Sequence, residues 1–134
     1  MDVFYHGGAR FETFDLAKAA DGGLFFTKDS WLAAQFMKKD GRLYAANLQM
    51  NNPKTVAAES FGYWDRNERG EGVFIHDPEL KQNAIALAKQ EGFDSLIVKA
   101  VPEGGEDFEP SDQFVVFSAE QVLVLMTRDT LGTA

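Results

Sequence analysis

Residues 22–36 read GGLFFTKDSWLAAQF, an apolar run followed at once by a capped helical pattern. The run LFFT at 24–27 comes directly after paired glycines. It is long enough for a buried strand and too short for a helix. Asp29 or Ser30 can cap the helix that follows, and Gly41 lies where a left-handed C-terminal residue is wanted. The segment therefore predicts a strand followed by a helix.

Short strands are predicted on both sides of this segment. Before it, VFYHGG at 3–8 is rich in β-prone residues and breaks at its two glycines. After it, RLYAANLQM at 42–50 alternates and stops at a turn, NNP. FDSLIVKAV at 93–101 and QFVVF at 113–117 are further strands. The tail SAEQVLVLMT at 118–127 fits a strand, a short helix, or one followed by the other.

A second helix is predicted from Asp77, which can cap it, with Pro78 in the first turn and Gly92 after its end. Its apolar stripe consists of Leu80, Ala84, Leu87 and Ala88. Residues 57–76 mix glycines, aromatic side chains and the charged run DRNER, so they are expected to form a mobile or functional loop. Residues 9–19 are expected to be a loop leading into a short helix.

These elements give mixed helices and short strands without a strand–helix–strand rhythm, which favours an α+β fold over a doubly wound one. The chain has 134 residues, of which 45% are apolar and 13% aromatic. A chain of this size and composition fits one compact domain, residues 1–134, with a real core.

Charge and composition exclude several function classes. The formal net charge of -8 disfavours binding to nucleic acid or to an anionic membrane surface. The absence of cysteine excludes disulfides, a thiolate nucleophile and thiolate metal ligands, and the two histidines have no zinc-binding spacing, so no metal site is expected. No GxSxG elbow or phosphate loop is present. Without a signal-like amino terminus or a membrane-length apolar run, the chain is expected to be soluble and cytoplasmic.

The chemistry-bearing residues form a constellation rather than a single motif. His6 ends a strand and precedes two glycines, which allow another molecule to approach the backbone closely. A histidine satisfied by its neighbours at a strand end is the alternative reading. Phe25 and Phe36 follow on the next strand and helix, where plain core packing is the default, and the amide Gln113 opens a late apolar strand.

In that order, FYHGG, GGLFFTKDSWLAAQF and DQFVVFSAEQV resemble the three sequence blocks of the ADP-ribosyltransferase fold shared by poly(ADP-ribose) polymerases and diphtheria-type toxins. The chain is most similar to the small ADP-ribosyltransferase-like domains of phage and mobile-element polyvalent proteins, whose NP turn and GYDG strand match NNPKTV and GFDSLIV here. The resemblance runs from residue 4 to about residue 122. It implies a split sheet of two facing small sheets with a few short helices, and NAD as the substrate.

The resemblance also implies roles for individual residues. His6 would hydrogen-bond a ribose hydroxyl of NAD, and Gly7 would bind the nicotinamide carboxamide through its backbone. Phe25 stands where relatives commonly have a tyrosine, and Phe36 stands where a second aromatic ring sandwiches the nicotinamide. Other residues with implied or inferred contacts are Thr27 and Ser30, as polar neighbours, and Arg10, as a partner of the pyrophosphate.

Gln113 falls where the family's catalytic glutamate belongs. Cleavage of the nicotinamide–ribose bond passes through an oxocarbenium-like species that a carboxylate stabilises, whereas an amide supplies only hydrogen bonds. Asp112 is adjacent, but strand alternation should turn it to the opposite face. The acids at 12, 15, 106, 107 and 109 have no matching position, and Ser111 leaves the acceptor unidentified.

Two main hypotheses follow. The first is a mono-ADP-ribosyltransferase or NAD glycohydrolase that uses His6, Phe25 and Gln113, with a protein side chain as the expected acceptor. The second is a degenerate module of the same fold that binds NAD, another nucleotide or a partner protein without turnover. An unrelated small α+β protein is a third, and a sheet order without a cleft over His6 would establish it. The oligomeric state is left open.

Overall fold

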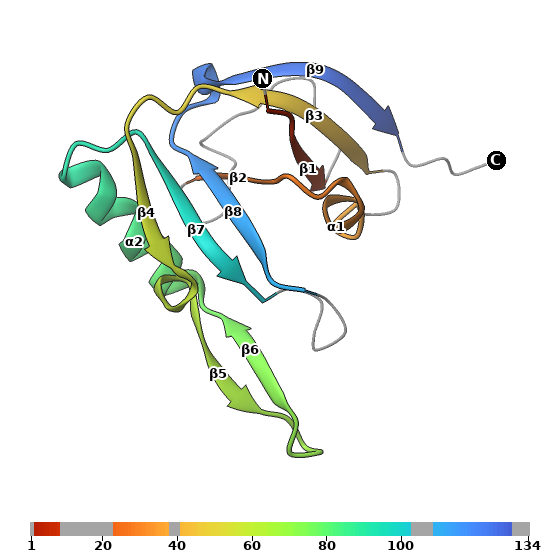
Figure 1. The fold of residues 1–134 in the computed structure, drawn as a ribbon, viewed down its shortest axis with the longest axis vertical. Coiled ribbons are helices and arrows are strands. Elements are labelled where there is room, and N and C mark those ends of the chain that lie inside the picture. The colour runs from red at the N-terminus through yellow and green to blue at the C-terminus, as the bar shows by residue number, and fades with distance from the viewer. Residues whose placement is uncertain (1, 9–22, 38–40, 103–108, 130–134) are drawn as a thin grey trace.

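The computed structural model describes residues 2–8, 23–37, 41–102 and 109–129 (Figure 1). The strands are β1 (Phe4–Gly8), β2 (Leu24–Thr27), β3 (Arg42–Leu48), β4 (Pro53–Ala57), β5 (Gly62–Arg66), β6 (Gly72–His76), β7 (Ser95–Val101), β8 (Ser111–Val116) and β9 (Val122–Asp129). The helices are α1 (Ser30–Ala34) and α2 (Pro78–Gln90), with 3-10 turns at Ala58–Ser60 and Ala119–Gln121. The expected α+β class is confirmed.

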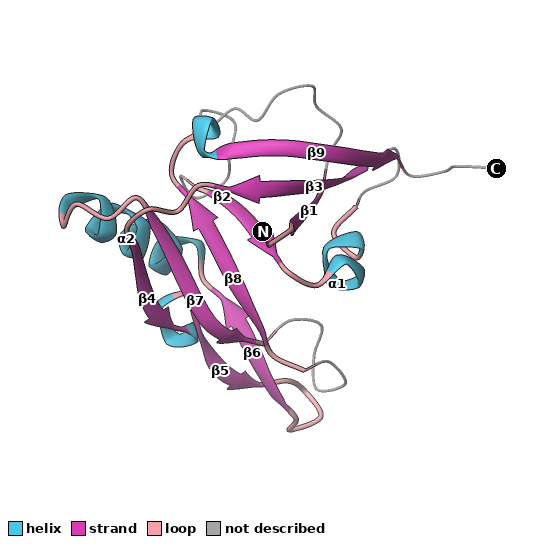
Figure 2. Cartoon of the chain, turned by 45° about the horizontal axis from the view of Figure 1, so that its top comes forward, coloured by secondary structure: helices cyan, strands magenta, loops and turns pink. Residues whose placement is uncertain are grey.

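Seven strands form one sheet in the order β4-β7-β8-β2-β1-β3-β9, and β5 and β6 form a separate two-stranded sheet. Neighbours in the large sheet are antiparallel except β4 and β7, which are parallel. Strands β3 and β9 cross the direction of β4, β7 and β8 at a steep angle (Figure 2). The two facing sheets expected from the resemblance are two parts of one continuous sheet, whose strands diverge in direction.

The divergence occurs between β1 and β2. These strands pair at one register position, Tyr5 opposite Thr27, whereas β1 pairs with β3 over five positions and β2 with β8 over four. We call this single pair the seam. One half-sheet, β4-β7-β8-β2, lies on one side of it, and β1-β3-β9 lies on the other.

Strand β8 begins with three polar residues and ends in a buried apolar run, residues 114–116, because both faces of the sheet are covered there. Val115 packs in a core beneath α2 with Ile85 and Ala88 of that helix. Its neighbours Phe114 and Val116 point to the other face, into a second core that includes Phe4 of β1 and the ring of Tyr44. The run QFVVF thus joins two cores, which is why a continuous apolar pattern was the correct sign of this strand.

The helices begin as predicted and differ elsewhere. Asp29 accepts hydrogen bonds from the amides of Trp31 and Leu32, and Asp77 caps α2 in the same way. Helix α1 ends at Ala34 rather than near Gly41, so the predicted C-terminal role of Gly41 is wrong. On α2 the predicted stripe is wrong in part: Ala88 is buried, but Leu87 is 50% exposed, and Ile85 supplies the buried apolar contact in its place.

Residues 57–76 are largely regular, in contrast to the expected loop. After the 3-10 turn, β5 and β6 pair over five positions as an antiparallel hairpin that extends away from the large sheet (Figure 1). Its turn closes through Asn67, whose side-chain oxygen accepts from the amides of Arg69 and Glu71. Strand β4 was missed as well, and the tail proves to be a 3-10 turn followed by the edge strand β9.

The sequence also predicted that no segment spans a membrane. Within the described segments, neither helix is long and apolar enough to cross a bilayer. The expected loop and short helix at 9–19 lie outside the described residues.

Candidate functional site

A cavity of about 230 Å³ opens where the sheet diverges at the seam. Of the residues singled out in the sequence, those that line it are His6, Gly7, Phe25, Thr27, Phe36 and Gln113. They come from β1, β2, β8 and the turn after α1, so the fold brings together segments separated by up to about a hundred residues. Ser30 is not among the lining residues, and Arg10 lies outside the described part of the chain.

His6 spans the gap between the diverging strands. Its Nδ1 lies 2.7 Å from the carbonyl oxygen of Phe25, and because a carbonyl only accepts, Nδ1 must carry the proton. In the neutral ring Nε2 is then the acceptor nitrogen. Burial lowers the pKa of His6 below its ordinary value of 6.5, and the hydrogen bond to Phe25 only partly opposes that effect. At neutral pH the imidazole is therefore uncharged.

Gly7 is required by the packing of α1 against β1. A Cβ built on this residue would lie 1.8 Å from the carbonyl oxygen of Ala33 and 3.4 Å from Met37. The first of these contacts is with the backbone of α1 and cannot be relieved by turning a side chain. The missing Cβ thus lets the helix sit against β1, which narrows the cavity on that side.

Two of the cavity's aromatic residues differ in burial. Phe25 is half-buried and packs edge-on against Phe61, with ring centroids 5.9 Å apart. Phe36 is 52% exposed, at the rim of the cavity. A planar ligand in the cavity would therefore meet two aromatic rings, one half-buried and one largely exposed.

Thr27 has a structural use for its hydroxyl. Its Oγ1 accepts from the amide of Asp29, the cap of α1, and lies 3.2 Å from Oγ of Ser111 on β8. The side chain is buried, with 7% exposure. Thr27 therefore forms part of the cavity wall while its polar atom ties β2 to the helix cap and to β8.

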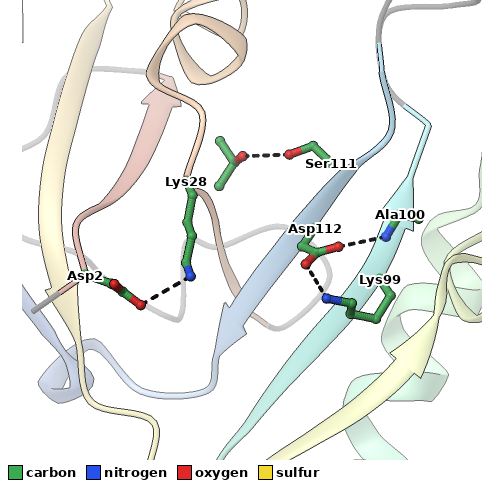
Figure 3. Close-up of polar contacts among 7 residues, drawn as sticks. Asp2, Lys28, Lys99, Ala100, Ser111 and Asp112 are labelled. Atoms are coloured by element: carbon green, nitrogen blue, oxygen red, sulfur yellow. Dashed lines mark hydrogen bonds and ion pairs between the residues drawn. The ribbon is translucent and has the colours of Figure 1, made fainter.

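Gln113 stands directly opposite Thr27 in the antiparallel pairing of β2 and β8. Paired residues share a face of the sheet, so the amide belongs to the same cavity wall as Thr27. Asp112 points the other way, as alternation predicts: its carboxylate accepts from Lys99 at 2.6 Å and from the Ala100 amide at 2.9 Å (Figure 3). Asp112 could not turn toward the cavity without breaking those contacts.

Ala100 shows how the sheet accommodates that arrangement. Its φ is 53°, the left-handed region that residues with a Cβ seldom adopt, and the pairing of β7 with β8 shifts between Val98 and Val101. The carboxylate of Asp112 binds the Ala100 amide within this bulge. Asp112 is thereby a structural acid.

Sequence reasoning missed five lining residues: Tyr5, Phe26, Leu32, Ala33 and Lys81. The first four are neighbours of predicted residues and could have been found from strand and helix periodicity. Lys81 comes from α2, and no local pattern links that helix to the site. Among the described lining residues none is a carboxylate, and Lys81 is the one with a permanently charged side chain. No cluster of three or more metal-ligating side chains occurs in the described residues.

Comparison with family models agrees with the resemblance seen in the sequence. A family model described as ADP-ribosyltransferase in polyvalent proteins matches residues 1–126. No curated protein matches the chain. A solved structure titled as the crystal structure of an anti-CRISPR protein superposes with a TM-score of 0.49 and 11% identity, covering 96% of this chain and 94% of that one.

Proposed function

Since the chain belongs to the ADP-ribosyltransferase family of polyvalent proteins, we propose that the seam cavity receives the nicotinamide–ribose end of NAD and supports slow cleavage of the bond between them. The C1′–N bond breaks and nicotinamide leaves with the electron pair. ADP-ribose passes to a nucleophile, for which we propose a protein side chain, and that nucleophile loses its proton. The activity belongs to the transferase type.

The observation that carries the proposal is the convergence of His6, Phe25 and Gln113 on one cavity from three separate strands. Neutral His6 donates to the Phe25 carbonyl through Nδ1, so Nε2 is the atom suited to accept from a ribose hydroxyl. Gly7 lines the same cavity, and its backbone is the group that we propose binds the nicotinamide carboxamide.

Gln113 explains why the proposed turnover is slow. An amide can hold a ribose hydroxyl but provides no formal charge to a positively charged transition state. Removal of one preorganised electrostatic contact typically costs on the order of 10²–10³ in rate. We therefore expect Gln113→Glu to raise nicotinamide release by roughly 10²-fold and His6→Ala to abolish it.

A second candidate function is favoured by the absence of any carboxylate among the described lining residues. In that case the domain binds a nucleotide or a partner without turnover, and the wild-type chain releases no nicotinamide.

Titration of the protein with NAD by calorimetry, followed by a nicotinamide-release assay on the same sample, separates the two candidates. Binding with release supports the transferase, and binding without release supports the binding module. If NAD neither binds nor is cleaved, and Gln113→Glu does not restore either property, the transferase proposal is wrong and NAD is not the ligand of a binding module.

A further inference from the structure

Three polar side chains form a row across the strands that line the cavity. Tyr5 on β1 stands opposite Thr27 on β2, and Thr27 stands opposite Gln113 on β8. Residues paired in an antiparallel sheet share a face, so the three side chains lie on one face of the sheet, and all three line the cavity. Because the pair of Tyr5 with Thr27 is the seam itself, Tyr5 is the β1 residue that the pairing holds in register with Gln113.

Among the described lining residues, two carry a hydroxyl group, and they differ in what that group does. The hydroxyl of Thr27 accepts from the Asp29 amide and lies 3.2 Å from Oγ of Ser111. The Tyr5 side chain is half-buried, and its phenol makes no hydrogen bond with a described residue. A tyrosine hydroxyl that is removed from bulk water usually has a hydrogen-bond partner, so the phenol is available for a ligand in the cavity.

The proposed ligand requires a donor of this kind. The neutral ring of His6 offers only an acceptor at Nε2, because Nδ1 donates to the Phe25 carbonyl. A ribose hydroxyl that donates its proton to Nε2 still has two lone pairs, and leaving them unpaired away from water is unfavourable. The Tyr5 phenol is a neutral donor that can satisfy such a lone pair on this hydroxyl or on the one beside it.

The spacing of the row suits a sugar. Two strand spacings, about 10 Å, separate the backbones at Tyr5 and Gln113. Tyrosine and glutamine side chains are each several ångströms long, so a ribose placed over Thr27 can contact both of them at once.

We infer that the Tyr5 phenol is a ligand-binding group that donates a hydrogen bond to a hydroxyl of the nicotinamide-side ribose, on the other side of Thr27 from Gln113. The inference rests on the proposed function, because it assumes that this ribose enters the cavity. It gives a role to a residue that neither the sequence pattern nor the family resemblance singled out. It also makes the ribose diol, rather than the nicotinamide ring alone, a feature that the cavity recognises.

The test uses calorimetry on the whole chain, with NAD and with two analogues that lack the 2′- or the 3′-hydroxyl of the nicotinamide-side ribose. Tyr5→Phe removes the phenolic oxygen and keeps the ring. It should weaken NAD binding by about threefold to tenfold, which is the usual contribution of one neutral hydrogen bond. For one of the two analogues, Tyr5→Phe and the wild type should bind equally, because that analogue lacks the hydroxyl to which the phenol donates.

Tyr63→Phe is the matched control. Tyr63 lies on β5, is 48% exposed and does not line the cavity, so this variant should bind all three ligands as the wild type does. Urea unfolding separates a ligand contact from a structural role. Tyr5→Phe should leave the free energy of unfolding unchanged, because the phenol has no partner among the described residues. Thr27→Val should lower it, because that change removes the hydroxyl that binds the Asp29 amide.

The outcomes separate the inference from the function on which it rests. If NAD binds in a Phe36-dependent manner and Tyr5→Phe binds it as tightly as the wild type does, the inference is wrong and the proposed function stands. A loss of affinity in Tyr5→Phe that persists with both analogues would mean that the phenol contacts no ribose hydroxyl, which also overturns the inference. If NAD binds neither the wild type nor Gln113→Glu, the proposed function fails and the inference fails with it.

Discussion

The imidazole of His6 is hydrogen-bonded through Nδ1 to the carbonyl oxygen of Phe25, at 2.7 Å, across two strands that pair at a single register position. The side chain thus has two tasks. It holds β1 and β2 at a fixed spacing where their pairing stops, and it lines the cavity, where we propose that it accepts from a ribose hydroxyl. The alternative reading of His6, a histidine satisfied by its neighbours, and the functional reading are compatible.

The stability of the fold should fall as the pH drops below the ordinary histidine pKa of 6.5. The folded-state pKa values of His6 and His76 are both lowered, so the unfolded chain binds more protons in this range. Stability therefore rises with pH there and is lost as the pH falls. Urea unfolding at about pH 7.5 and about pH 5.5 measures the effect, and His6→Gln should reduce it. An unchanged free energy of unfolding across this range would contradict the prediction.

Asp112 changes its protonation at a lower pH, outside the range of that experiment. Burial opposes the ionisation of Asp112, but hydrogen bonds from Lys99 and the Ala100 amide outweigh it and lower its pKa. Its contribution to stability is present above the ordinary aspartate pKa and is lost as the pH falls through the lowered pKa of the folded state.

Gly7→Ala should lower the free energy of unfolding by about 2 to 4 kcal/mol, because the new methyl group would overlap the Ala33 carbonyl and force α1 off the sheet. Gly72→Ala is the control: its Cβ would meet only Trp64, at an ordinary 3.9 Å. Chemical denaturation compares the two. Equal stabilities for both variants would mean that α1 does not need the close approach at Gly7.

Ala100→Gly should stabilise the protein by about 1 kcal/mol, because glycine adopts a φ of 53° without the Cβ penalty. The matched change Ala57→Gly, on the exposed side of β4, should destabilise it by roughly 0.5 to 1 kcal/mol. Thermal or urea unfolding gives both values. If Ala100→Gly lowers the stability instead, the positive φ does not strain Ala100.

Phe36→Ala should weaken NAD binding by roughly threefold to tenfold through the loss of one stacking surface. Because the ring is 52% exposed, the fold should tolerate its removal. Trp31→Ala removes a neighbouring aromatic ring that is 58% exposed and does not line the cavity, so it should leave affinity unchanged. Similar losses for both variants, measured by calorimetry, would argue for a nonspecific effect on α1.

The parts of the fold that the sequence predicted are those with strong local signals. Asp77, Pro78 and Gly92 delimit α2 through capping and backbone chemistry that act within a few residues. The β5–β6 hairpin lacked such a signal, because its strands are largely exposed and depend on cross-strand pairs such as Trp64 with Phe74, whose centroids are 5.5 Å apart. Contacts of that kind are invisible before the pairing is known.

The site divides in the same way. Strand alternation predicted that Asp112 would face away from Gln113, and the contacts of Asp112 confirm it. The family resemblance identified residues on β1, β2 and β8 that the fold does bring together. Lys81 could not be found, because its place in the cavity depends on how α2 packs beneath the sheet rather than on any neighbouring residue.

The seam also affects how the molecule opens. One backbone pair connects β1 to β2, and the imidazole of His6 and the packing of Phe4 with Phe26 in the second core add to it, whereas β7 and β8 pair over five positions. Amide hydrogen exchange should therefore be slower for the protons of β7 and β8 than for those of β1 that face β2. Ligand bound in the cavity would touch β1 and β2 at once, and its clearest signature would be slower exchange along β1.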